Sequence, residues 1–149
     1  MKLSYEDVTE SFLNKIREFE FLKIDEDDRQ AIVDGYMKRS VANCKKSILN
    51  YNLSLYDDDF REFNDEIEDE DIDDLLEIIT EGMVVQWLKP YVFTQENLEN
   101  VLNTRDYSQY SPAELLKQVT ATYRRAQKDF TQLAREYSYN HGDLTELHL

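Results

Sequence analysis

Glycine, proline and cysteine are all scarce in this chain. It has three glycines, two prolines and one cysteine among 149 residues. A β-sandwich needs turn residues every few positions, so this scarcity argues against one and favours helices joined by short polar loops. The lone Cys44 excludes an intramolecular disulfide, and with no signal-peptide segment at the N-terminus it predicts folding in a reducing cytoplasm. No apolar run approaches the roughly 20 residues of a membrane span.

Negative charge dominates what the chain does contain, and it is concentrated in one place. The formal net charge is −15. The segment 57–77 has thirteen acids and a single base, Arg61, so it carries −12 and the rest of the chain only −3. We call it the acidic segment. Such a block repels nucleic acid at close range and is unsuited to binding phosphate, so the sequence predicts a nearly neutral body with one acidic surface.

Apolar spacing predicts an all-α fold, a small bundle of about five helices in a chain of one-domain length. Ser4 begins the first helix as its cap, and Asp25 caps the second. Gly35 lies inside the second helix, where it is expected to allow a close helix crossing. Residues 50–64 are expected to form a loop with room for one short helical turn.

The third helix is predicted to be the most buried, because apolar residues surround it on most sides. It begins near Asp69 and should end by Lys89, since Pro90 follows. Thr94 caps a short fourth helix. A long helix over 112–138, with one narrow apolar stripe, then completes a helical domain of residues 1–138. Residues 139–149 form a C-terminal docking tail.

No catalytic, cofactor-binding or metal-binding motif is found. The acidic segment lacks the glycine that an EF-hand loop requires at its sixth position. Zinc is disfavoured because Cys44, His141 and His148 are not spaced as ligand pairs. Cys44 lies on an apolar stripe, where a core thiol is expected. The sequence therefore predicts a protein that is not an enzyme and needs no cofactor.

Basic side chains decorate the last helix and have two interpretations. They form ion pairs with acids of the same helix, or they face acidic surface on a neighbouring copy in a head-to-tail contact. The second interpretation predicts these inter-subunit residues: Arg124, Arg125, Lys128, Asp69, Asp71 and Asp73.

The end of the chain is rich in side chains that anchor interfaces. Chain ends often fray, but these residues favour a segment that orders when it binds a partner. The predicted docking residues are Tyr137, Tyr139, His141, Leu144, Leu147 and Leu149.

Several short motifs resemble a known family. They are Gly-Met-Val-Val-Gln-Trp-Leu-Lys-Pro at 82–90, Asn-Thr-Arg-Asp-Tyr-Ser at 103–108 and Tyr-Ser-Tyr-Asn-His-Gly-Asp-Leu at 137–144, with shorter matches at 96–98 and 110–112. Over roughly the last 70 residues, the chain is similar to small acidic head–tail connector proteins, encoded in the head-assembly gene clusters of tailed bacteriophages of Gram-positive hosts.

The resemblance implies a structural virion protein of the phage neck, made in the host cytoplasm. Connectors of this type are helical, form a ring of about twelve copies and dock their C-terminal segment onto the portal. The implied partners are the portal protein, the next neck or tail protein and other copies of the chain, while DNA passes without specific binding. The resemblance leaves open whether the layer is adaptor, stopper or tail completion.

Two other functions compete with this interpretation. The acidic segment is also what an acidic DNA mimic would carry to inhibit a host nuclease or restriction enzyme, although such a mimic should spread its acids over much of its surface. A regulatory protein that binds an amphipathic partner helix is the third alternative.

Overall fold

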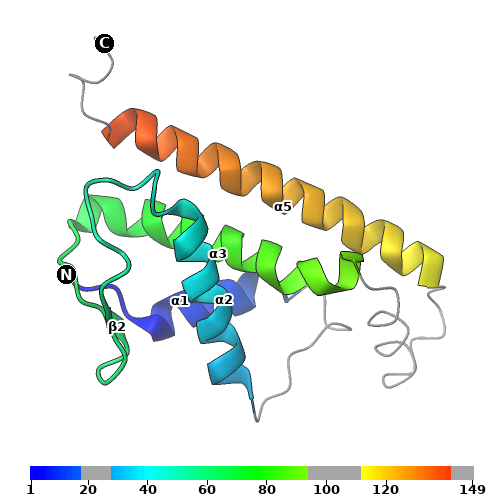
Figure 1. Cartoon of the computed structure of the whole chain (residues 1–149), viewed down its shortest axis with the longest axis horizontal. Helices are drawn as coiled ribbons and strands as arrows, with labels where there is room; N and C mark the ends of the chain where they lie inside the picture. The colour runs from blue at the N-terminus through cyan, green and yellow to red at the C-terminus, as the bar shows by residue number, and fades with distance from the viewer. Residues whose placement is uncertain (18–27, 94–111, 142–149) are drawn as a thin grey trace.

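Four helices and one short hairpin form the part of the chain that the structure, a computed structural model, describes: residues 1–17, 28–93 and 112–141 (Figure 1). The helices are α1 (Tyr5–Lys15), α2 (Arg29–Cys44), α3 (Asp69–Phe93) and α5 (Pro112–His141). The strands β1 (Tyr56–Asp57) and β2 (Glu62–Phe63) pair antiparallel. The chain is therefore mostly helical, as predicted. The expected cap at Asp25 and the short helix after Thr94 lie outside the described residues.

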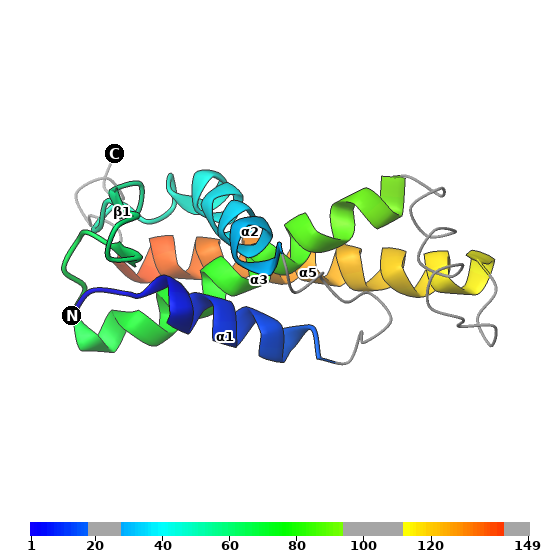
Figure 2. The same cartoon turned by 90° about the horizontal axis from the view of Figure 1, so that it is seen from below.

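Helix α3 is the central helix of the molecule, as predicted from the apolar residues on most of its sides. It packs against α1, α2 and α5, and Figures 1 and 2 show α5 running along it while α2 crosses it steeply. Most side chains in its middle are buried, with Trp87, Leu88 and Ile79 at most 1% exposed. Burial of apolar side chains on several faces of one helix holds the other helices around it.

Helix α5 packs through the narrow stripe that the sequence predicted. Leu115, Val119 and Ala126 are buried, and α5 contacts α3 along its length. The helix begins at Pro112 and continues to His141, three residues beyond its predicted end at 138. The helix therefore includes the first three residues of the segment predicted as a docking tail, 139–141, and contacts described below hold its last turn.

Pro90 does not end α3, contrary to the prediction. The helix runs through it to Phe93. A proline removes one backbone hydrogen bond and crowds the preceding turn, but it leaves the rest of the helix intact. Tyr91 and Val92 still pack against the core beyond Pro90, which offsets that cost.

The hairpin was also missed, since residues 50–64 were expected to be a loop. Its strands have two residues each, with Tyr56 opposite Phe63. The N-terminal segment stabilises it from outside: Phe63 N–H donates to the carbonyl of Leu3 (2.8 Å), and Ser4 bridges Glu62. Such pairing joins residues about 60 positions apart, which local spacing does not reveal.

Candidate functional site

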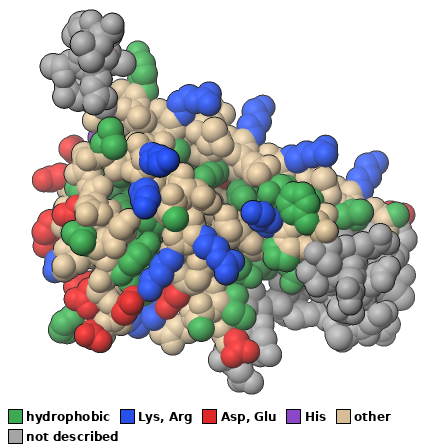
Figure 3. Space-filling model, viewed as in Figure 1, with side chains coloured by type: hydrophobic (Ala, Val, Ile, Leu, Met, Phe, Trp, Pro, Cys, Tyr) green, Lys and Arg blue, Asp and Glu red, His purple; other side chains and the backbone are tan. Residues whose placement is uncertain are grey.

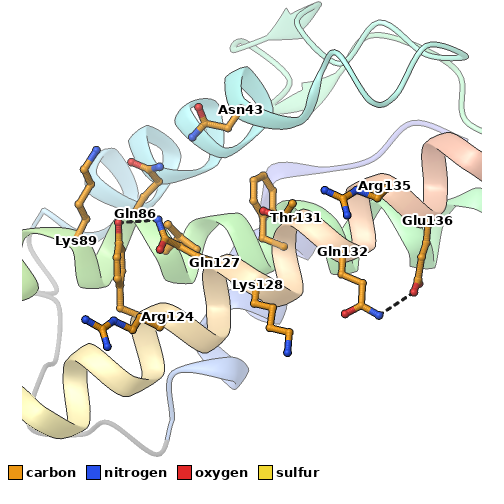
Figure 4. A pocket seen from close by; sticks show the side chains of 13 residues that line it. Asn43, Gln86, Lys89, Arg124, Gln127, Lys128, Thr131, Gln132, Arg135 and Glu136 are labelled. Carbon is orange, nitrogen blue, oxygen red and sulfur yellow. Dashed lines mark hydrogen bonds between the residues drawn. The ribbon is translucent and has the colours of Figure 1, made fainter.

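A groove runs along α5 where that helix meets α2 and α3 (Figure 4). Its volume is ≈ 1000 Å³. Asn43 comes from α2, Gln86 and Lys89 come from α3, and the other labelled side chains come from α5. Four cations and one carboxylate line it: Lys89, Arg124, Lys128, Arg135 and Glu136. We call this the basic groove.

The cations of the basic groove are not neutralised within the described ranges. There, neither these four side chains nor the nearby Arg125 makes an ion pair. Glu136 instead accepts a hydrogen bond from the amide of Gln132 (3.0 Å; Figure 4). The ion pairs that one interpretation expected for these α5 cations are thus absent from the described part. The groove keeps its positive charge, which attracts an anionic partner.

Apolar side chains also line the basic groove. Val85 of α3 and Tyr123 of α5 are 8% and 7% exposed, and Phe130 lies beside them, half-buried. The ring of Phe93, at the end of α3, meets Tyr123 edge-on with centroids 6.0 Å apart and remains 69% exposed. The groove therefore combines a basic lining with aromatic and aliphatic surface, the mixture found at protein interfaces.

The acidic segment lies elsewhere, around the hairpin and the first turns of α3. Figure 3 shows basic side chains along α5 and over α2, and acidic ones gathered at the edge beside the hairpin. Some acids have intramolecular partners: Asp58 accepts from Tyr5 Oη and Lys38 Nζ, and these two bonds lower the pKa of Asp58. Others are exposed and unpaired within the described part of the chain: Asp59, Glu68, Asp69, Glu70, Asp73 and Asp74.

Asp71 differs from its neighbours because it is buried, at 6% exposure. Its carboxylate accepts hydrogen bonds from Tyr51 Oη (2.6 Å) and from His141 Nε2 (2.9 Å). His141 Nδ1 faces the carbonyl of Tyr137 at 3.0 Å, and the two rings stack with centroids 3.9 Å apart. Tyr137 in turn donates to Asn50 (2.9 Å). This network, which we call the α5 latch, fastens the end of α5 to the start of α3.

The imidazole of His141 faces acceptors on both nitrogens. A carbonyl and a carboxylate both require an N–H, so the doubly protonated ring suits this position. Burial alone would lower the pKa of His141, but the bonds to Tyr137 and Asp71 outweigh it and raise the pKa above its ordinary value of 6.5. Burial has the opposite effect on an acid, and it raises the pKa of the Tyr137 hydroxyl to about 12.

The predicted docking and inter-subunit residues therefore differ in where they lie. Tyr139 is 73% exposed, whereas Tyr137 is buried against its own chain and His141 is paired with Asp71. Leu144, Leu147 and Leu149 lie outside the described residues. Asp71, predicted to face another copy, is used inside the α5 latch. Asp69 and Asp73 are exposed on α3, and Arg124 and Lys128 line the basic groove while Arg125 does not.

One prominent surface residue was not singled out from the sequence. Phe60, in the turn between β1 and β2, is 79% exposed. The signal was present in the sequence, as an aromatic residue directly after three aspartates. The sequence signal alone does not predict that Phe60 is exposed, because only the folded hairpin shows that the ring points away from the core.

Cys44 is buried, as its place on an apolar stripe predicted, and burial raises the pKa of its thiol to about 12. The described helices include none long and apolar enough to cross a membrane. Across residues 1–17, 28–93 and 112–141, no three or more His, Cys, Asp or Glu side chains are grouped to hold a metal ion.

Comparison with known proteins gives no relative for this chain. No protein-family model matches it, and neither the curated proteins nor the solved structures contain a significant match.

Proposed function

We propose that this chain is a structural protein of the phage neck, a head–tail connector or adaptor that assembles into a ring below the portal and catalyses no reaction. The layer within the neck stays open between adaptor, stopper and tail completion. The motifs at 82–90 and 137–144 carry the resemblance on which this proposal rests.

The separation of charge on the folded molecule is the observation that best supports it. Unpaired cations line the basic groove along α5, while exposed acids surround the hairpin and the start of α3. Two different surfaces of opposite charge favour head-to-tail contacts between identical copies, and such contacts close into a ring when the rotation permits. An acidic lining in a conduit also lets DNA slide without binding.

The end of α5 gives a second, independent support. The α5 latch fixes the last turn of α5, up to His141, against the start of α3. A docking segment held at a fixed place on each subunit suits a ring that must contact a portal ring at every copy.

The acidic DNA mimic is less well supported. A mimic needs acids along a duplex-like path, but α5 presents the unpaired cations of the basic groove, and several acids of the acidic segment are neutralised by Lys15, Lys38 and the N-terminus. These cations would repel a nuclease whose own surface is basic.

The test is the absolute copy number of this protein in purified virions of the phage that encodes it, by quantitative mass spectrometry. We expect a fixed ring stoichiometry of about twelve copies per particle. Absence from the particle would overturn the proposal, and steeply salt-dependent binding to a basic nuclease would then favour the mimic.

A further inference from the structure

Phe60 is the most exposed of the large hydrophobic residues in the described part of the chain, at 79%. It stands in the turn that joins β1 to β2. An exposed phenylalanine ring is costly in water and favourable in a partner's pocket, so a ring presented in this way is a candidate interface anchor.

The turn that presents Phe60 is held rigidly. Phe60 N–H donates to the carboxylate of Asp57 (3.1 Å), and Tyr5 N–H donates to the carbonyl of Arg61 (2.9 Å). Arg61 adopts the left-handed conformation (φ 54°), and its guanidinium donates two hydrogen bonds to Asp34 (2.7 and 3.0 Å). Because the turn is already ordered, little conformational entropy is lost when its tip binds a partner.

Three aspartates, residues 57–59, directly precede Phe60 in the turn. Arg61, which follows Phe60, pairs with Asp34, and Lys38 pairs with Asp58. Asp59 is exposed and makes no ion pair with any described residue. The tip of the hairpin, residues 57–60, is therefore an aromatic anchor with acidic flanks.

The basic groove has the complementary character. Its apolar lining of Val85, Tyr123 and Phe130 suits an aromatic ring, and its unpaired cations, including Arg124 and Lys128, suit acidic flanks (Figure 4). Tip and groove lie on separate parts of the molecule: the groove follows α5 and the second half of α3, while the hairpin lies beside the first half of α3 (Figure 1).

We infer that the hairpin tip of one copy docks into the basic groove of a second copy, with Phe60 seated against the apolar lining and Asp59 facing the cations. The inference rests on the proposed function, which requires a repeated contact between copies, and it names the two surfaces that make it. Because tip and groove are different surfaces, the contact is head-to-tail and leaves a free tip and a free groove at the two ends of any open assembly.

The contact is tested with full-length chains by sedimentation velocity over a concentration series reaching millimolar. We expect wild type to self-associate. Phe60→Ser should raise the dissociation constant by about tenfold or more, because it removes the aromatic anchor. Asp59→Lys and Lys128→Glu should each weaken self-association by about tenfold. Lys117→Glu on α5 and Glu10→Lys on α1 are matched controls at exposed positions outside the groove, the tip and the predicted inter-subunit residues, and they should have little effect.

Mixing two variants gives the sharpest readout. Asp59→Lys places like charges at every contact between its own copies, and so does Lys128→Glu. In a mixture, copies that alternate restore opposite charges at every contact, so association should return to within about threefold of wild type. A structural defect in either variant would not be repaired by mixing.

Each other outcome overturns the contact. If wild type stays monomeric over the whole series, or if it associates but mixing gives no rescue, the tip does not dock into the groove. Neither result bears on the copy number in virions, which decides the proposed function separately.

Discussion

Gly82 on α3 faces close-packed side chains of both α2 and α5. A Cβ added there would clash with the hydroxyl of Ser40 on α2 and would lie 2.7 Å from Cε1 of Phe130 on α5. Ser40 is fully buried and donates to the carbonyl of Ile79 (2.7 Å), so it has little freedom to move. The close crossing that the sequence assigned to Gly35 therefore lies at Gly82, and the assignment to Gly35 was wrong.

Gly82→Ala should destabilise the protein by about 1–3 kcal/mol, because the added methyl group must displace packed side chains. Gly35→Ala is the matched control. Nothing lies within 4 Å of its added Cβ, and alanine is the better helix former, so this change should stabilise by about 0.5–1 kcal/mol. Urea unfolding followed by circular dichroism measures both. Equal stabilities for the two variants would contradict the crossing.

His141 makes the stability of the α5 latch depend on pH. Its folded pKa is raised above the ordinary 6.5 that it has in the unfolded chain. Its contribution is therefore complete below pH 6.5 and is lost as the pH rises through the folded value.

His141→Gln should cost about 1 kcal/mol at a pH of about 5.5 and clearly less at about 8.5. Urea unfolding of wild type and variant at both pH values measures the difference. An NMR titration of Asp71→Asn supplies the control, since loss of the carboxylate should lower the pKa of His141. A loss of stability that is the same at both pH values would show that the imidazolium is not the stabilising form.

Helix α5 is held to α3 by its apolar stripe. Two adjacent leucines allow the effect of packing to be measured apart from helix propensity, because Leu→Ala changes helix propensity equally at both positions. Leu115 is fully buried and Leu116 is half-buried. Leu115→Ala should destabilise by about 2–4 kcal/mol, and Leu116→Ala by roughly half of that, because it removes less buried surface and leaves a smaller cavity. Differential scanning calorimetry checks this order. If both variants melted alike, α5 would not be packed through the predicted stripe.

The two errors in predicting secondary structure, the end of α3 at Pro90 and the missed hairpin, have the same cause. Pro90 and the hairpin both depend on contacts made elsewhere: residues beyond Pro90 pack on the core, and β2 pairs with the N-terminal segment through Leu3 and Ser4. Spacing within one segment reports only which face is apolar, so it located α1, α2, α3 and α5 and their stripes. It carries no information about a partner strand about 60 residues away.

For the whole molecule, the proposed portal contact can be separated from the fold by the place of truncation. Removing everything after His141 keeps the α5 latch, so the melting temperature should stay within about 2 °C of the full chain. Binding to the portal ring should be lost, as surface plasmon resonance would show. Truncation after Ser138 also deletes His141, and this shorter chain should be less stable.

Unchanged portal binding by the chain that ends at His141 would exclude residues 142–149 as the docking segment. It would leave Tyr139, exposed on the last turn of α5, as the remaining predicted docking residue among those that the structure describes.

The sequence by itself determined the helical character of the chain, the central place of α3, the packing stripe of α5 and the block of acidic charge. These follow from residue type and from local periodicity, which act within a few turns of one helix. Only the tertiary structure decided that Asp71 is the hydrogen-bond partner of His141 and that Gly82 is the site of the close helix crossing. It also decided that Phe60 is exposed on a rigid turn and that α2, α3 and α5 together form the basic groove. Each of these joins or positions residues through contacts between segments far apart in the chain, and such contacts exist only once the core has packed.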